Sequence, residues 1–419
     1  MMNVSGTPAG IKKEILLLIS LIVLGTFVYY RIIANERNLM TGLVFLSGIS
    51  VFLFFLYEIS ARIFRLKSDT KNSHRLLIIS VTVSLIGLEI FLRVGLNKYS
   101  NYYEKNGSKN YQSIYEYDNS KWFWVHYPGE DLRWTKTEFT HIRKTNSLGL
   151  SEKEIPLVKG KDEIRIIALG DSYTEGVGTS YESTWAKVVE RNLTRSIPNK
   201  KITVINAGIS GSDPFFEYVL LKEKLLVFKP DFVIVAINHS DIDDIILRGG
   251  MERFQTNGTV SFRKPPKWEW IYSISYIFRH IIHDLFQYDW LLMKKSEREY
   301  NEQMAMIKMK GVLEKFDGMA KEIGFGLLIV FHPHEYEVKN ERYESKSFSE
   351  LISGLMREKR LPVIDLLDDY KKNLMNKDNY SEFFWKIDMH HNTKGYEAMG
   401  NAIGSKITEM GLIAQNGGA

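Results

Sequence analysis

The chain has 419 residues, 44% of them apolar, and its formal net charge is +5 at pH 7. This length predicts two or three structural units, and so modest a charge without a dense basic patch argues against nucleic acid as a partner. The sequence contains no cysteine, which excludes disulfides, thiolate catalysis and cysteine-bound metals.

The first 97 residues are the most apolar part of the chain and form a predicted membrane domain. Residues 15–30 and 38–57 carry no charge, and residues 76–92 carry only Glu89. A membrane-spanning helix needs about 20 largely apolar residues. With a few flanking residues added to the first and third segments, the sequence predicts three transmembrane helices.

The basic residues around these segments are unevenly distributed. Lys12 and Lys13 precede the first segment, and only Arg31 and Arg37 lie between the first and the second. Five lie between the second and the third, namely Arg62, Arg65, Lys67, Lys71 and Arg75. Because cytoplasmic loops carry the excess of positive charge, we expect a multi-pass protein of the cell membrane whose later residues lie outside the cytoplasm.

Two charged residues interrupt the third apolar segment. Glu89 and Arg93 are four residues apart, so they share one face of a helix. We favour an ion pair near the outer membrane surface, and contact with a partner membrane protein is the alternative.

Residues 98–162 form an aromatic-rich lead-in, in which residues 137–142 are a strand candidate. From residue 163 onward, short apolar stretches alternate with amphipathic ones. The apolar stretches predict strands at 164–169, 202–206, 232–237, 324–331 and 362–366. The amphipathic stretches predict helices at 182–193, 215–227, 297–323, 348–358 and 394–410. This order is typical of a parallel sheet covered by helices on both faces, with ligands bound beyond the carboxyl ends of the strands.

Polar motifs follow these strands or precede the last helix. They are GDS at 170–172, NAGISGSD at 206–213, NHSDIDD at 238–244, HPHEYE at 332–337 and DMHHNTKGY at 388–396. Each alone has a structural explanation, such as helix capping by Ser172 or a turn at Asp388. Gathered at one edge of a sheet, they indicate nucleophilic catalysis by serine.

The GDS motif with Gly176, the NAGISG motif and the DMHHN motif resemble three sequence blocks of the SGNH, or GDSL-type, hydrolases. The resemblance covers about residues 163–412, which we take as the catalytic domain. It implies a flavodoxin-like three-layer α/β fold, and it implies ester hydrolysis or acyl transfer as the activity.

The resemblance also implies roles for individual residues. Ser172 would be the nucleophile, a histidine the general base, and Asp388 the group that orients that histidine. The spacing to the following Asn and Gly favours His390, which we prefer, whereas the commoner Asp-x-x-His spacing favours His391. The backbone N–H groups of Ser172 and Gly211 would hold the oxyanion.

The third block departs from the family pattern, which has an asparagine before an aspartate. Here Ser240 precedes Asp241, and Asn238 lies two residues earlier. Either Ser240 donates to the oxyanion or Asn238 reaches it from a shifted turn, and the sequence leaves both open.

An insertion at about residues 247–298 follows the third strand. Its recurring aromatic residues predict an amphipathic helix that packs on the domain, covers the cleft as a lid or rests on the membrane surface. In the fourth motif, one of His332 and His334 is expected to touch substrate. A His-x-His pair without a third ligand does not predict a metal site, and we expect no cofactor.

These features predict a membrane-anchored serine esterase outside the cytoplasm that acts on O-acyl groups of envelope carbohydrate or glycolipid. An O-acyltransferase that works with a membrane acyl-donor protein is the alternative. An inactive glycan-binding scaffold is a third hypothesis, of another class.

Overall fold

The structure is a computed structural model that describes residues 39–64, 66–96, 125–254, 263–373 and 375–413. The chain divides into two compact units. The first comprises Met1–Tyr117 and Lys264–Arg298, and the second comprises Asp118–Arg263 and Glu299–Ala419. Most of the predicted insertion therefore groups with the first hundred residues and not with the sheet.

The described residues of the first unit contain two long apolar helices. Helix α2 spans Leu39–Ile63, and helix α3 spans Ser68–Phe91 and continues into the π-helical turn η1, Leu92–Leu96. Within the described residues, two windows, Leu43–Ala61 and Ser68–Leu96, are long and apolar enough to cross a membrane. They coincide with the second and third predicted helices, whereas the first, near residues 15–33, lies outside the described residues.

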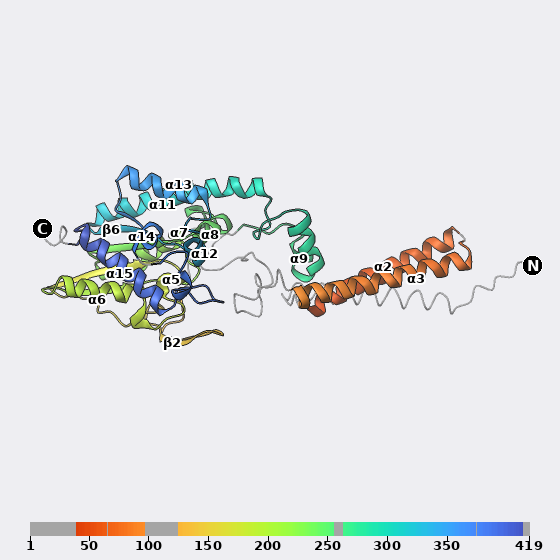
Figure 1. Ribbon diagram of the computed structural model, residues 1–419, viewed down its shortest axis with the longest axis horizontal. Helices are drawn as coiled ribbons and strands as arrows, with labels where there is room; N and C mark the ends of the chain where they lie inside the picture. The colour runs from red at the N-terminus through yellow and green to blue at the C-terminus, as the bar shows by residue number, and fades with distance from the viewer. Residues whose placement is uncertain (1–38, 65, 97–124, 255–262, 374, 414–419) are drawn as a thin grey trace, which may run out of the picture. The chain divides into compact units, whose positions relative to one another are not determined.

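Helices α2 and α3 form an antiparallel hairpin (Figure 1). At its connected end, Arg75 pairs with Glu58 at 2.7 Å. At the other end lie three short helical turns of the insertion, α9 (Glu269–Ile274), α10 (Tyr276–His280) and the π-helical η6 (Ile281–Leu285). Helix α9 contacts α2, and α10 contacts α3 and η1.

The second unit is built on a five-stranded parallel sheet, as the sequence predicts. Its strands, in chain order, are β3 (Glu163–Leu169), β4 (Lys201–Asn206), β5 (Phe232–Ile237), β6 (Gly326–Phe331) and β7 (Val363–Asp365). Their order across the sheet is β4-β3-β5-β6-β7, and every pairing is parallel. This is the flavodoxin-like order, in which the direction of winding reverses beside the first strand and leaves a crevice at the carboxyl ends.

The central strands β5 and β6 are apolar along their whole length because both faces of the sheet are covered. Strand β5, FVIVAI, is buried at every position, as expected for a central parallel strand. Figure 1 shows α11 (Lys295–Ile323) and α13 (Lys346–Glu358) above the strands, and α6 (Trp185–Ser196) and α15 (Thr393–Glu409) below them.

The remaining helical segments of this unit are short. They are α5 (Ser172–Glu175), η2 (Tyr181–Ser183), α7 (Pro214–Leu220), η3 (Leu221–Leu225), η4 (Leu226–Phe228), α8 (Ser240–Arg248), η5 (Met251–Arg253), α12 (Glu335–Asn340), α14 (Leu366–Asn373) and η7 (Tyr380–Glu382). The helix predicted at 215–227 is thus α-helical only over its first half.

The lead-in contributes a separate antiparallel hairpin of β1 (Asp131–Thr135) and β2 (Thr140–Lys144). The strand predicted at 137–142 is therefore displaced, since its first residues form the turn. The N–H of Lys136 donates to the carbonyl of Phe139 and closes that turn at 2.9 Å.

Candidate active site

The turn after β3 presents Ser172 at the carboxyl end of an inner strand. Gly170 has φ +150°, and a Cβ there would lie 2.1 Å from Oγ1 of Thr174. Only glycine fits this close approach. Asp171 then caps α5, because its carboxylate accepts the N–H of Tyr173 at 2.9 Å. Ser172 is thus the first helical residue and remains half-buried.

His390 joins Ser172 to Asp388. Its Nε2 lies 2.8 Å from Oγ of Ser172, and its Nδ1 lies 2.6 Å from Oδ1 of Asp388. In the tautomer with the proton on Nδ1, the ring donates to Asp388 and accepts the hydroxyl proton of Ser172. The geometry matches a nucleophile, a base and an orienting carboxylate.

Asp388 is held in its ionised form. Burial raises its pKa, but the hydrogen bond and charge of His390, together with the charge of Lys136, outweigh burial and lower it. An ionised carboxylate favours a positive charge on the ring beside it. Asp388 can therefore stabilise the imidazolium that forms when His390 takes a proton.

His391 has a different position and a different environment. Its side chain is fully buried, stacks on Phe384 with ring centroids 4.3 Å apart, and donates from Nδ1 to the carbonyl of Phe383 at 3.2 Å. Burial lowers its pKa to about 3, with His390 nearby acting in the same direction. The structure therefore places His390, and not His391, beside Ser172.

Two backbone N–H groups are candidates for holding an oxyanion. In the described part of the chain, neither the N–H of Ser172 nor that of Gly211 donates to an acceptor. Gly211 has φ +76°, and its carbonyl accepts Nη1 of Arg248 at 2.6 Å. Arg248 thereby fixes the loop in which Gly211 lies.

Asn238 belongs to a buried network behind the nucleophile turn. It is fully buried, and its Nδ2 donates to Asp171 at 2.9 Å and lies 3.3 Å from Nε2 of His332. Its Oδ1 accepts the hydroxyl of Ser240 at 2.7 Å and Nε2 of His334 at 2.8 Å. Both amide hydrogens are therefore directed at protein acceptors, and the half-buried Ser240 donates to Asn238.

His332 and His334 pack around the residue that follows the nucleophile. The ring of Tyr173 lies 4.9 Å from His332 and 5.3 Å from His334, on which it is stacked. Burial lowers the pKa of both histidines, so both are neutral near pH 7. His332 is fully buried, whereas His334 is half-buried, so His334 is the more exposed of the two.

No group of three His, Cys, Asp or Glu side chains arranged to hold a metal occurs among the described residues.

Tyr173 also supports the loop that carries Asp388 and His390. Its hydroxyl donates to the carbonyl of Met389 at 3.2 Å. Met389 has φ +67°, a left-handed conformation that costs about 1–3 kcal/mol for a residue with a side chain and persists only where its surroundings impose it. Met389 separates Asp388 from His390, whose side chains contact each other, and His390 contacts Ser172.

The lead-in hairpin supplies two residues that sequence reasoning missed. Arg143 of β2 is buried and donates to the carbonyls of Glu175 and Gly176, and to that of Thr179 at 2.9 Å. It therefore holds the end of α5. Glu138, in the β1–β2 turn, accepts the backbone N–H groups of residues 386, 387 and 388 at 2.9, 2.8 and 3.0 Å.

No local pattern marks Arg143 or Glu138. Each is one charged residue among many in a polar hairpin, and its partners are backbone groups far along the chain, which have no sequence signature.

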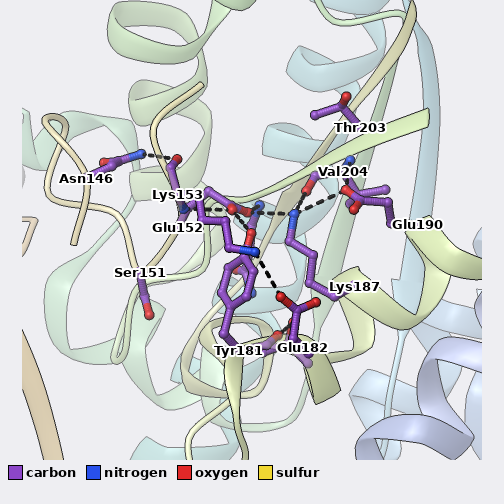
Figure 2. A network of polar contacts seen from close by, with 12 residues as sticks. Asn146, Ser151, Glu152, Lys153, Tyr181, Glu182, Lys187, Glu190, Thr203 and Val204 are labelled. Atoms are coloured by element: carbon purple, nitrogen blue, oxygen red, sulfur yellow. Dashed lines mark hydrogen bonds and ion pairs between the residues drawn. The ribbon is translucent and has the colours of Figure 1, made fainter. Parts of the chain in front are cut away.

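A second buried network ties the lead-in to the sheet (Figure 2). Glu152 lies 3.0 Å from Nζ of Lys187 and accepts the hydroxyl of Tyr181. It also accepts the N–H of Asn206 at 2.8 Å. Because Asn206 donates from its side chain to the carbonyl of Thr174 at 2.8 Å, the network ends at the nucleophile turn.

Glu175 extends this support to the NAGISG loop. Its carboxylate accepts the N–H of Ser210 at 2.8 Å and contacts Nε2 of His126 at 2.8 Å. Burial raises the pKa of Glu175, but these hydrogen bonds and the charge of His126 lower it overall.

The part of the chain that contains Ser172, Asp388 and His390 is also the part that matches a known protein family. Residues 168–398 match the model of the GDSL-like Lipase/Acylhydrolase family. None of the curated proteins compared matches the chain.

Three of the solved structures found similar to this chain are esterases or acylhydrolases. A two-domain esterase active on acetylated mannans, crystallised with mannopentaose, is 16% identical with a TM-score of 0.35, over 59% of this chain and 49% of that one, so the chain spans about half its length. A lipase/acylhydrolase from Enterococcus faecalis is 19% identical with a TM-score of 0.35, over 59% and 96%. The acetyl xylan esterase AlAXEase is 17% identical with a TM-score of 0.33, over 59% and 99%.

The family model covers more than half of this chain, so the chain belongs to the GDSL-like lipase/acylhydrolase family. This membership supports an ester-hydrolysing enzyme.

Proposed function

We propose that the protein is a membrane-attached serine esterase that removes O-acyl groups from envelope carbohydrate or glycolipid outside the cytoplasm. The observation that carries the catalytic part is the continuous hydrogen-bonded path from Oγ of Ser172 through His390 to Asp388.

In the proposed reaction, Oγ of Ser172 attacks the ester carbonyl while its proton passes to Nε2 of His390. The carbonyl π electrons move to the oxygen, which the N–H groups of Ser172 and Gly211 stabilise. Collapse of this intermediate breaks the bond to the alcohol, which leaves with the proton from His390. Water then attacks the acyl-enzyme by the same route and releases the acid.

Attachment to a membrane, and not a sugar-binding residue, supports the proposed substrate class. Two candidate membrane spans precede the catalytic unit, and basic residues concentrate between them. A site held on the outer side of such a membrane would meet acylated envelope carbohydrate and glycolipid. His334, the more exposed histidine of the HPH motif, is the proposed substrate contact.

The first test is labelling by a fluorophosphonate, followed by identification of the modified residue by mass spectrometry. We expect modification at Ser172, none in Ser172→Ala, and unchanged labelling in Ser180→Ala, a matched change at an exposed serine. Absence of labelling in the folded wild type would instead favour an inactive glycan-binding scaffold.

The second test separates hydrolysis from transfer. The protein is incubated with an acetylated glycan, with and without an unacetylated acceptor glycan. Free acetate at the same rate in both reactions supports the esterase. Acetyl groups on the acceptor would support an O-acyltransferase, in which an acceptor hydroxyl replaces water at the acyl-enzyme and a membrane partner supplies the acyl group.

A further inference from the structure

Glu89 is a carboxylate in an otherwise apolar stretch of α3. Its neighbours Leu88 and Ile90 are exposed, whereas Glu89 is 0% exposed. A charged side chain inside a membrane span is costly unless it is paired or hydrogen-bonded. The contacts that bury Glu89 therefore show what covers this face of α3.

Among the described residues, the groups that donate hydrogen bonds to Glu89 belong to the insertion. Oε1 accepts the N–H of Tyr276 at 2.7 Å, and Oε2 accepts the N–H of Ile277 at 3.1 Å and the hydroxyl of Ser275 at 3.0 Å. The first N–H groups of a helix have no partner within that helix. Glu89 supplies the acceptors for α10, so a side chain from α3 satisfies the start of a helix about 190 residues later.

Further contacts fix the same segment to both helices of the hairpin. Arg93 donates to the carbonyl of Ile274 at 3.2 Å, and its guanidinium lies 4.5 Å from the ring centroid of Tyr276. On the α2 side, the rings of Phe45 and Trp270 meet edge to face at 5.4 Å. Helices α9 and α10 are therefore docked on the hairpin (Figure 1).

The position of Glu89 along α3 sets the depth of α9 and α10 relative to the candidate membrane span. Glu89 lies seven residues before Leu96, the last residue of the candidate span, which corresponds to roughly 10 Å along a helix. The start of α10 consequently lies beside the end of the span and not beyond it.

The segment also exposes residue types that suit a membrane surface. Trp270, Leu285 and Phe286 are 36%, 69% and 55% exposed. Exposed lysines flank them, namely Lys264, Lys267, Lys294 and Lys295. Exposed aromatic and aliphatic side chains with flanking lysines are typical of elements that lie at the lipid headgroups.

We infer that residues 264–298 form a membrane-surface element, docked on the Leu96 end of α3 through Glu89, whose exposed apolar side chains insert among lipid headgroups. This inference rests on the membrane attachment included in the proposed function. It gives the chain a second contact with the bilayer, immediately before α11 leads back to the catalytic unit.

The test uses the full chain in lipid nanodiscs, with single cysteines labelled by an environment-sensitive fluorophore. The cysteine-free background makes each label unique. Leu285→Cys and Phe286→Cys report on the segment, Val83→Cys on the span, and Val158→Cys on an exposed site of the catalytic unit. Nitroxide lipids labelled near the headgroup or deep in the acyl chains act as quenchers.

We expect the labels at 285 and 286 to lose fluorescence mainly to the shallow nitroxide, the label at 83 to lose it mainly to the deep one, and the label at 158 to be unaffected. If the labels at 285 and 286 behave like that at 158 while the label at 83 is quenched, the membrane-surface element is wrong although the attachment stands. If the label at 83 is not quenched either, both the attachment and the inference fail. Esterase activity, measured on the same samples, reports on the catalytic proposal independently.

A second comparison tests the role of Glu89 in docking. In the Leu285→Cys background, Glu89→Leu should reduce shallow quenching, because α10 loses its acceptors. Glu58→Leu, a matched change at the opposite end of the hairpin, should leave quenching unchanged. Equal quenching in all three proteins would mean that Glu89 does not hold the segment at the membrane.

Discussion

The carboxylate of Glu138 accepts the backbone N–H of Asp388 at 3.0 Å. Glu138 lies in the lead-in hairpin, outside the region that matches the family model, whereas Asp388 lies inside it. The same carboxylate accepts the two preceding N–H groups. A turn 250 residues away in sequence thus holds the loop that orients the proposed base.

Removal of this carboxylate is expected to impair catalysis without removing a catalytic group. Glu138→Ala should lower kcat by roughly 10- to 100-fold, because small displacements of catalytic groups have effects of this size, and KM should change little. Glu138→Gln keeps one acceptor oxygen and should recover part of the loss. Steady-state kinetics on one soluble ester measures kcat and KM for each variant, with folding checked by thermal melting.

The control for Glu138 is Glu154→Ala. Glu154 is a lead-in glutamate that also accepts a backbone N–H, that of Ser147, away from Ser172 and His390. The Glu154→Ala substitution should leave kcat unchanged. Equal kcat losses in Glu154→Ala and Glu138→Ala would assign both effects to general loosening of the lead-in.

The two adjacent histidines should respond differently to substitution. His390→Ala should reduce kcat by roughly 10⁶-fold, because the triad loses its base, and the protein should melt as the wild type does. His391→Ala should destabilise the fold by about 2–4 kcal/mol, since it leaves a cavity beside Phe384. Denaturant titration and initial rates distinguish the two, and a folded His390→Ala protein with nearly normal kcat would refute the assignment.

The side chain of Asn238 is expected to stabilise the fold and not to bind the oxyanion. Asn238→Ala leaves the buried carboxylate of Asp171 without its amide donor, which should cost about 1–3 kcal/mol of stability. Asn238→Asp preserves shape but places a second carboxylate against Asp171, so it should be at least as harmful. Ser240→Ala should have a small effect. If Asn238→Ala instead melts normally and loses only rate, Asn238 is the oxyanion donor.

Glu217 should make the stability of the catalytic unit decrease as pH rises. Burial raises its pKa well above the usual value, and the charges of Asp213 and Asp171 raise it further, although the hydroxyl of Ser212 opposes them. A carboxyl whose folded-state pKa exceeds its unfolded value stabilises the fold at low pH. That contribution is lost as pH increases from the unfolded pKa toward the folded one, by about 1.4 kcal/mol per pH unit.

Glu217→Gln removes this titration, so its stability relative to wild type should increase between about pH 4 and pH 7. Thermal melts across that range measure the difference. Glu223→Gln, at an exposed position nearby, is the control and should show no trend. A difference independent of pH would mean that Glu217 is ionised in the folded protein.

The membrane topology can be tested with the same cysteine-free background. Val158→Cys, on the catalytic unit, should react with an impermeant thiol reagent in intact cells, whereas Lys67→Cys, in the basic link between α2 and α3, should react only after permeabilisation. The reverse pattern would place the catalytic unit in the cytoplasm and exclude an envelope substrate.

The sequence by itself determined the parallel sheet and its order of elements, because apolar strands buried on both faces have an unmistakable composition. The sequence also predicted that Ser172, Asp388 and a histidine lie at one edge of the sheet, because polar motifs follow parallel strands or precede the last helix. These signals are local, and a single chain displays them directly.

The sequence favoured His390 over His391 through the spacing to Asn392 and Gly395, and the tertiary structure places the ring of His390 beside Ser172. Both residues follow the same aspartate, and their order says little about which ring points outward. In the folded chain His390 contacts Ser172, while His391 is buried and stacks on Phe384.

Tertiary structure also decided which distant residues support the site. Arg143 and Glu138 act on backbone carbonyls and N–H groups, which every residue possesses, so their partners leave no trace in the sequence. Glu89 illustrates the same limit in the first unit. The sequence predicted its ion pair with Arg93, whose Nη2 lies 3.8 Å from Oε1 of Glu89, whereas only the folded chain shows its hydrogen bonds to the start of α10.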